Sequence, residues 1–302
     1  MAVEHFDLAV AWDWEYDRGF ISLLEREIQH HGLRFYSISH HNVHETLKLL
    51  QKGILTFTTF LDRASDADEN FLPLARHVRK SPVKFLNHPD AVSHAIDKAT
   101  MHLEFLTKGI DVPYTIIISP YNKKRDVELS LSELAHLGRP FIIKPANTTG
   151  GGIGVILGAE TLKDVIESRQ HHKNDKYLLQ GKIMPGWLGP RKAWFRVFSA
   201  CDTTIPCWWD DETHIYANVS NDEMSIHGLE PLITTTQKIS EVCGLEFFST
   251  EVAITEEKKF IVVDYVNDIC DMRLQSQHPD GVPDAVVEKL CGSLARHVKS
   301  LR

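Results

Sequence analysis

Residues 139–157 read RPFIIKPANTTGGGIGVIL, and this stretch decides the fold. A short apolar run rich in β-branched residues lies at each end, which indicates two buried strands joined by a glycine-rich loop. Glycine tolerates a positive φ and has no side chain to keep a ligand away, so the N–H groups of Gly150, Gly151 and Gly152 are expected to converge on a phosphate. Lys144, at the end of the first strand, would supply the matching positive charge. The stretch therefore predicts an anion-binding hairpin.

The glycine loop differs from the common nucleotide signatures. No Gly-Lys-Ser/Thr follows the glycines, and the loop leads into a strand rather than a helix. These two features argue against a P-loop and against a Rossmann dinucleotide site. Turns also collect glycine for their geometry alone, so a hairpin without a ligand is the alternative that the rest of the chain must decide.

Composition indicates a soluble globular protein of two or three subdomains. The chain has 302 residues, of which 43% are hydrophobic and 25% charged. A net charge of −8 gives no basic footprint for nucleic acid. The five cysteines form no C-x-x-C pair, which favours a reducing cytoplasm over a disulfide or zinc framework. No secretion signal and no membrane-spanning run is expected.

The first 87 residues alternate between strand and helix patterns, which predicts a parallel α/β domain. Predicted strands lie at 6–12, 33–38, 54–60 and 83–86, and predicted helices at 20–31, 43–51 and 71–78. The acidic loop 62–68 follows the third strand. Ligands of open α/β sheets bind beyond the carboxyl ends of strands, so this loop is a candidate for substrate contact, with a solvated loop as the alternative.

A lysine-bearing helix precedes the glycine hairpin. Pro89 and Asp90 favour a helix start, and apolar spacing predicts that one helix continues over residues 91–107, with Lys98 in its middle, followed by a Gly-Ile-x-Val-Pro turn. This order, with Lys144 before the glycine loop, resembles the ATP-grasp enzymes. The resemblance implies that Lys98 and Lys144 contact the phosphates of ATP.

The segment YLLQGKI at residues 177–183 resembles the part of the ATP-grasp family that recognises adenine through backbone groups. By that resemblance Gln180, Gly181, Lys182 and Ile183 contact the base. The family usually has an acidic residue where Gly181 or Lys182 stands, so the sequence departs from the pattern here.

Two arginines are candidates for catalysis. The stretch RKAWFRVFSACD at 191–202 resembles a family strand whose arginine faces the phosphates, and Arg196 matches it. Trp194 stands where many relatives carry an acid. Arg273, on a later loop, suits an anionic substrate or the transferred phosphoryl group, and a surface ion pair with Asp271 is the alternative.

The last hairpin carries acids in two otherwise apolar strands. A buried carboxylate needs a partner, and a metal ion is one such partner. By resemblance Glu251, Asp264 and Asn267 bind Mg²⁺. Asn267 lies three residues after Asp264 instead of two, and such residues point to opposite faces of a regular strand. Either a bulge or the strand end brings Asn267 round, or Asp268 or the main chain replaces it; solvated strand ends are the alternative.

The resemblance implies an α/β fold that becomes α+β in its C-terminal part. The predicted parts are a pre-ATP-grasp domain at 1–87, a small subdomain with a glycine-rich lid at 88–175, and a subdomain with the Mg²⁺-binding hairpin at 176–302. A long amphipathic helix over 282–301 is expected to close the core.

The implied function is ATP- and Mg²⁺-dependent ligation of a carboxylate to an amine or thiol through an acyl phosphate, with ADP formed and a carbon–nitrogen bond as the expected product. The partners implied are a small-molecule carboxylate and a nucleophile, with neither nucleic acid nor membrane, and a homodimer is possible. Two alternatives stay open: a small-molecule kinase on the same fold, and a catalytically silent nucleotide-binding module.

Overall fold

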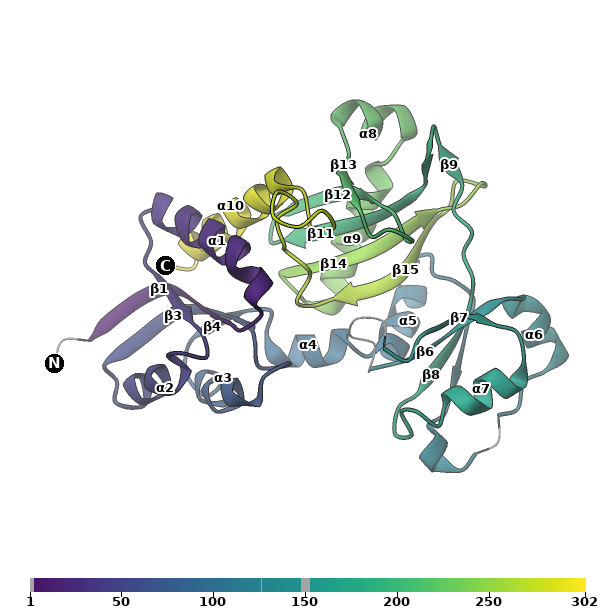
Figure 1. Ribbon diagram of the computed structural model, residues 1–302, viewed down its shortest axis with the longest axis horizontal. Helices are drawn as coiled ribbons and strands as arrows, with labels where there is room; N and C mark the ends of the chain where they lie inside the picture. Colours follow the sequence, from purple (N-terminus) through teal and green to yellow (C-terminus); the bar gives the residue numbers. More distant parts are fainter. Residues whose placement is uncertain (1–2, 126, 148–152) are drawn as a thin grey trace.

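The computed structural model describes residues 3–125, 127–147 and 153–302, and three main sheets carry the fold (Figure 1). The first is parallel with strand order β2-β1-β3-β4. Its strands are β1 Glu4–Trp12, β2 Phe35–Ile38, β3 Leu55–Arg63 and β4 Lys84–Leu86, and helices α1 Arg18–His30, α2 Val43–Gln51 and α3 Leu72–Val78 connect them. The N-terminal part is therefore α/β, as predicted.

The end of the chain returns to this N-terminal sheet. Helix α10, Asp284–Ser300, packs beside α1, and both lie on the same face of the sheet (Figure 1). Leu290 and Leu294 of α10 are fully buried in one apolar cluster with Phe20 and Leu24 of α1. The amphipathic stripe read from the sequence is thus core, and it joins the two ends of the chain.

The second sheet is antiparallel with strand order β5-β8-β6-β7. Its strands are β5 Thr115–Ile118, β6 Phe141–Pro145, β7 Ile156–Ala159 and β8 Tyr177–Gly181, covered by α6 Leu131–Leu137 and α7 Leu162–Ser168. Strands β6 and β7 form the antiparallel hairpin predicted around the glycine loop. Gly150, Gly151 and Gly152 themselves lie outside the described residues.

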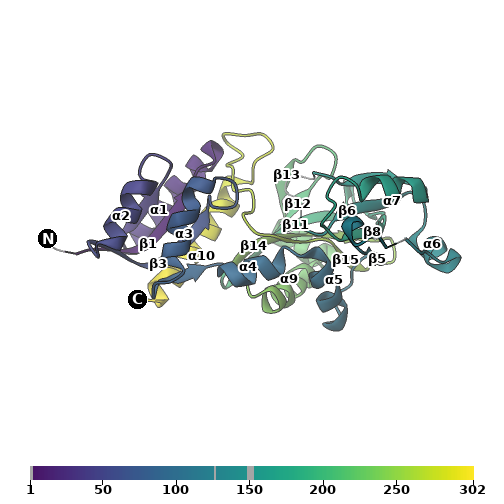
Figure 2. The same ribbon diagram turned by 90° about the horizontal axis from the view of Figure 1, so that it is seen from below.

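The third sheet is antiparallel with strand order β13-β12-β11-β14-β15. Its strands are β11 Trp194–Ala200, β12 Thr203–Trp209, β13 Tyr216–Asn218, β14 Phe247–Ile254 and β15 Phe260–Asn267. A small ribbon, β9 Trp187–Leu188 and β10 Arg191–Lys192, leads into it, and α8 Asn221–His227 and α9 Glu230–Cys243 connect β13 to β14. Figure 2 shows α9 beneath this sheet, where α9 shares an apolar cluster with β11, β14 and β15.

The helix predicted through residues 91–107 begins at Pro89 and ends at Thr107 as expected, but the prediction of a single continuous helix is wrong. The chain forms α4, Pro89–Ala95, and α5, Lys98–Thr107, separated by Ile96 and Asp97. The Asp97 carboxylate caps α5 by accepting hydrogen bonds from two N–H groups of its first turn. Lys98 is therefore the first residue of a helix, and its backbone N–H donates to the Ala146 carbonyl at 3.1 Å, beside the glycine loop.

The three sheets follow one another along the molecule, and α4 runs between the first sheet and the other two (Figures 1 and 2). Strand β8 begins just after the predicted boundary at residue 176 and pairs with β5 and β6. The domain boundaries themselves remain a prediction. Among the described helices, none combines the length and apolar character that a bilayer crossing requires.

Candidate functional site

The register of the β14–β15 hairpin places three candidate metal ligands on one face. Glu251 lies opposite Asp264, and Ser249 lies opposite Asn267, so two steps along β14 match three steps along β15. The extra residue is a β-bulge, which turns Asn267 to the face of Asp264. The amide Nδ2 of Asn267 donates to Asp264 Oδ2 at 2.9 Å. The bulge thus allows Asp264 and Asn267, three residues apart, to lie on the same face of the strand.

A second irregularity in β15 receives one of the candidate lysines. Val252 and Glu251 are adjacent on β14, but their partners on β15 are two residues apart, so Val263 is the extra residue. The Val263 carbonyl accepts a hydrogen bond from Lys144 Nζ at 3.1 Å. Lys98 reaches the same place from α5, with Nζ 3.9 Å from Asp264 Oδ1. Both lysines therefore lie close to Asp264, the acid of β15.

Arg196 of β11, Glu251 of β14 and Asp264 of β15 lie side by side across three neighbouring strands. Arg196 lies opposite Glu251 in the ladder and forms a close ion pair with it. Its guanidinium lies over the ring of Trp209, 5.0 Å from the centroid. Trp194 stands on the same face and donates its indole N–H to the second oxygen of Glu251 at 3.3 Å. Both oxygens of Glu251 are thus partnered within the sheet.

The β14–β15 cluster consists of Lys98, Lys144, Arg196, Glu251 and Asp264, and its charges shift the pKa values of its members. Burial lowers the pKa of Lys144 to about 8, with Lys98 adding to the shift and Asp264 opposing it. Burial would raise the pKa of Asp264, but the surrounding cations outweigh it and hold that pKa below its usual range. Burial raises the pKa of Glu251, and the charge of Asp264 adds to this against the attraction of Arg196. Three cations and two carboxylates leave the cluster formally positive, which suits an anionic ligand.

Gln180 lies in the interior between the second and third sheets. It is fully buried in β8, and its Nε2 donates to Thr115 Oγ1 at 3.1 Å and to the Tyr265 hydroxyl at 3.0 Å. Its Oε1 is buried and has no hydrogen-bond partner among the described residues. A buried acceptor left without a donor is costly, so this oxygen suits a ligand that brings a donor.

The segment after β8 is more open. The N–H of Gly181 donates to the Tyr114 carbonyl at 2.8 Å, so that group is already used by the protein. Lys182 and Ile183 follow the end of the strand, where Lys182 is exposed and Ile183 half-buried. Of the four predicted base contacts, these two offer backbone beyond the β8 ladder.

Arg273 lies with a different set of partners. Its guanidinium is held by Asp271 at 2.7 Å and Asp280 at 2.9 Å, and it lies 5.6 Å from the ring centroid of Trp14. The ion pair with Asp271, which the sequence left open as the alternative, is therefore present. These contacts do not connect Arg273 with the β14–β15 cluster.

The sequence did not point to His102 or Tyr265. The Tyr265 hydroxyl contacts His102 Nδ1 at 2.6 Å as well as Gln180, and Lys144 Nζ lies 5.4 Å from the Tyr265 ring centroid. His102 follows Lys98 by four residues on α5, a spacing that puts both on one helix face and could have identified it. Within residues 3–125, 127–147 and 153–302, no group of three or more His, Cys, Asp or Glu side chains is arranged to hold a metal. The metal ligands predicted on the hairpin instead combine two carboxylates with an amide.

The structure thus combines a parallel α/β domain with two antiparallel sheets, which meet at a lysine-flanked acidic hairpin. No family model and no curated protein matches this sequence. Solved structures, however, match almost the whole chain, and they show that it has the ATP-grasp fold.

Three of these structures illustrate the similarity. A RimK domain ATP-grasp protein from Sphaerobacter thermophilus is 19% identical, with a TM-score of 0.65 over 96% of this chain and 98% of that one. The ATP-grasp ligase PsnB, solved with a minimal precursor, Mg and ADP, is 13% identical, with a TM-score of 0.62 over 98% of both chains. The D-alanine–D-alanine ligase of Bacillus anthracis, solved with ATP, is 12% identical, with a TM-score of 0.61 over 97% of both.

Proposed function

We propose that the protein is an ATP- and Mg²⁺-dependent ligase that joins a carboxylate to an amine or thiol, with carbon–nitrogen bond formation the expected reaction. The observation that carries the proposal is the bulged hairpin, on which Glu251, Asp264 and Asn267 share one face. Structural neighbours solved with ATP, or with Mg and ADP, support the same reading of the fold. The expected cytoplasmic location and homodimer remain predictions.

The residues of the hairpin fit Mg²⁺ in chemistry. Mg²⁺ is a hard cation that takes oxygen ligands, and two carboxylates with the amide oxygen of Asn267 are such a set. Glu251, Asp264 and Asn267 would hold the ion. When bound, it would supply positive charge that neutralises the phosphates.

The cations of the site fit a polyphosphate. Arg196 Nε is buried without a hydrogen-bond partner among the described residues, so an acceptor such as a phosphate oxygen would satisfy it. Lys98 and Lys144 would hold the phosphates from the two sides of Asp264. Arg196 would then stabilise charge on the transferred group.

The remaining predicted contacts complete the nucleotide site. The orphaned Oε1 of Gln180 would accept a hydrogen bond from the amino group of the base, and the backbone of Lys182 and Ile183 would meet its edge. The glycine loop, including Gly150 to Gly152, would cover the phosphates and exclude water, which otherwise hydrolyses the intermediate.

The proposed reaction has two steps. A substrate carboxylate oxygen attacks the γ-phosphorus, and ADP leaves with the electrons of the broken bond. The nucleophile then attacks the acyl carbon, inorganic phosphate leaves, and the nucleophile loses its proton. Arg273 remains a proposed contact for the anionic substrate, which would compete with Asp271 and Asp280 for its guanidinium.

The test is calorimetric titration of the protein with ATP, with and without Mg²⁺. Wild type is expected to bind in a Mg²⁺-dependent way, and Lys144→Met to bind at least about tenfold more weakly, because a hydrogen bond to a charged group contributes roughly 1.5–3 kcal/mol. Lys259→Gln, an exposed cation on the turn of the same hairpin, is the matched control. Binding that ignores both Mg²⁺ and Lys144 would contradict the proposal.

A second assay separates ligase from kinase. Carboxylates are screened with ATP, Mg²⁺ and hydroxylamine, which traps an acyl phosphate as a hydroxamate. Hydroxamate formation with ADP release is expected for a ligase. A stable phosphorylated product formed without a second nucleophile would instead identify a small-molecule kinase.

A further inference from the structure

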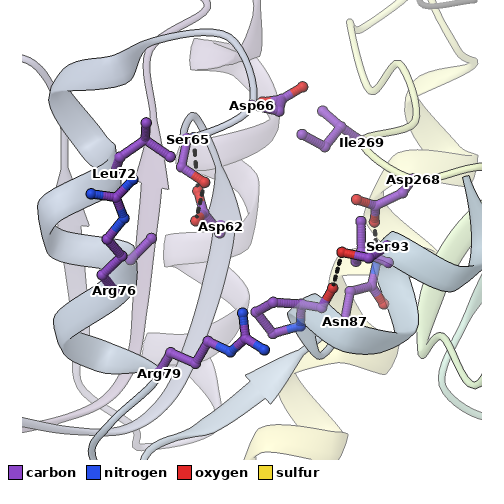
Figure 3. Close-up of a pocket in the computed structure, with 13 residues that line it drawn as sticks. Asp62, Ser65, Asp66, Leu72, Arg76, Arg79, Asn87, Ser93, Asp268 and Ile269 are labelled. Carbon is purple, nitrogen blue, oxygen red and sulfur yellow. Dashed lines mark hydrogen bonds between the residues drawn. The ribbon is translucent and has the colours of Figure 1, made fainter. Parts of the chain in front are cut away.

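A cavity of about 310 Å³, the α3–α4 cavity, lies where the N-terminal domain meets the rest of the chain (Figure 3). Its walls are the loop after β3, helix α3, the start of α4, and the two residues that follow β15. The lysines, arginine and acids of the β14–β15 cluster do not line it. The sequence pointed only to the acidic loop at 62–68, and the proposed nucleotide site leaves this cavity unexplained.

One wall is cationic. Arg76 and Arg79 lie three residues apart on α3, so they share a helix face. Arg79 forms a close ion pair with Asp90, but both side chains are more than half exposed, so a ligand can compete for Arg79 at little cost. Within the part of the chain that the structure describes, Arg76 makes no ion pair or hydrogen bond.

The opposite walls are acidic. Asp62 forms a turn in which its carboxylate accepts hydrogen bonds from the backbone and side chain of Ser65, and this turn sets the position of Asp66 at the rim (Figure 3). Asp268 lies on the far wall, where one of its oxygens accepts a hydrogen bond from Asn87 Nδ2. The carboxylates of Asp66 and Asp268 thus line the cavity on the walls opposite α3.

Apolar side chains occupy the space between the charged walls. They are Leu72, Ala75, Pro89, Val92 and Ile269. A ligand that matches this cavity carries an anionic group, a cationic group and an apolar portion between them. A volume of about 310 Å³ equals that of roughly ten water molecules in the liquid, which limits the ligand to a small molecule.

We propose that this cavity binds a small zwitterion whose carboxylate meets Arg76 and Arg79 and whose ammonium group meets Asp66 and Asp268. Charge-assisted hydrogen bonds at both ends give such a ligand its orientation, and the apolar walls accept its stem. Molecules of the amino-acid class, with an amine separated from a carboxylate by a short apolar chain, have this form.

The position of the cavity gives the zwitterion a role that rests on the proposed ligase function. Asp268 directly follows Asn267, so the acidic wall of the cavity and the proposed metal-binding face are joined by consecutive residues. In this proposal Asp268 holds the ammonium end on the side of the hairpin, whereas Arg76 and Arg79 hold the carboxylate end on the side of α3. The zwitterion is then the amine substrate of the ligase.

The first experiment needs no nucleotide. The full chain is titrated calorimetrically with the ω-amino acids from glycine to 6-aminohexanoate, and with alkylamines and alkanoates of matched length. At least one zwitterion is expected to bind at least about tenfold more tightly than either singly charged relative. Failure of every ω-amino acid to bind would overturn the proposal.

Variants assign the binding to the cavity. Arg76→Gln and Asp66→Asn are each expected to weaken zwitterion binding about tenfold, since each removes a charged partner from an exposed side chain without disturbing the core. Lys80→Gln and Glu69→Gln are the matched controls, because they are exposed neighbours that do not line the cavity. Binding that survives both cavity variants unchanged would overturn the assignment.

A final titration separates this proposal from the nucleotide site. With Mg²⁺ and a non-hydrolysable ATP analogue, the zwitterion is expected to bind at least about threefold more tightly, because phosphate charge attracts its ammonium group. Zwitterion binding in a protein that fails to bind ATP would refute the ligase function and keep the cavity site. An unchanged zwitterion affinity beside bound nucleotide would refute the substrate role.

Discussion

The β14–β15 cluster and the α3–α4 cavity both hold ion pairs, but in opposite surroundings. The side chains of Arg196 and Glu251 are 14% and 11% exposed, whereas those of Arg79 and Asp90 are 53% and 67% exposed. A buried pair cannot lose one partner without leaving a charge in the interior, and an exposed pair can exchange its partner for water. The same chemistry therefore makes one region rigid and the other open to competition by a ligand.

The two regions are also assembled differently. The register of adjacent strands sets the hairpin cluster, while docking of distant segments sets the cavity. Asn87 secures that docking: it has a φ of +64°, and its side-chain oxygen accepts hydrogen bonds from the N–H groups of Glu246 and Phe247 at 3.0 and 2.8 Å. An asparagine tolerates this left-handed conformation better than most residues.

The largest effect is expected from Arg196→Met. This change leaves Glu251 buried without its cation, and it should destabilise the protein by about 3–5 kcal/mol. Unfolding in guanidinium chloride measures the loss. Lys192→Met, which breaks half-exposed pairs with Asp211 and Glu212, should cost less than about 1 kcal/mol.

The double variant Arg196→Met/Glu251→Met checks the cause. With both charges removed, most of the lost stability should return, because well-packed apolar residues can replace a buried ion pair. If Arg196→Met alone costs no more than Lys192→Met, the two regions do not differ as described.

The next effect concerns nucleotide affinity. Asp264→Asn keeps the size of the side chain but removes the charge that faces Lys98, and it should weaken ATP binding in the presence of Mg²⁺ by about 100-fold, or about 2.7 kcal/mol. Binding without Mg²⁺ should change much less. Glu257→Gln, in the turn of the same hairpin, is the control for charge alone, and an equal loss in both variants would argue against a metal site.

The sequence predicted most elements because their patterns are local. Alternating strands and helices in the first 87 residues, and the paired strands around the glycine loop, follow from apolar periodicity and turn residues. The prediction of one continuous helix over 91–107 was wrong because Asp97 acts as an N-cap. Its carboxylate accepts hydrogen bonds from backbone N–H groups and so starts a new helix within the apolar pattern. An Asp followed by Lys98 was visible, but periodicity alone does not separate a cap from a solvated side chain.

The site was predictable in residue type more than in geometry. The spacing of Asp264 and Asn267 required an irregular strand, but only the pairing with β14 reveals the bulge. The link between Tyr265 and His102 joins residues 163 positions apart, so no local pattern contains it. The cavity depends on how domains dock, which composition and spacing do not encode.

The pH dependence of stability is expected to depend on His102, which is buried. Burial, aided by the charge of Lys144, lowers the pKa of His102 to about 4, whereas its pKa in the unfolded chain is about 6.5. As the pH falls, His102 is therefore protonated in the unfolded chain before it is protonated in the folded protein. Its contribution to the free energy of unfolding is complete above pH 6.5 and is lost as the pH falls toward 4. Between pH 7 and pH 4.5 the loss should be about 2 kcal/mol.

Urea unfolding of wild type and His102→Gln at the two pH values measures this contribution. The variant should lose less stability on acidification than wild type does. His136→Gln removes an exposed histidine and should leave the pH dependence unchanged. Equal acid sensitivity in wild type and His102→Gln would mean that His102 is already protonated in the folded interior.

The smallest effect on stability is expected at Arg79. Arg79→Gln breaks the exposed pair with Asp90 and should cost less than about 1 kcal/mol in urea unfolding, because water replaces each partner. The same change removes a cation from the cavity, so it should still weaken zwitterion binding severalfold. Asp90→Asn separates the two roles: it breaks the same pair but leaves Arg79 free, and it should strengthen zwitterion binding. If both variants change binding in the same direction, the pair itself shapes the cavity, and Arg79 is not competing between Asp90 and a ligand.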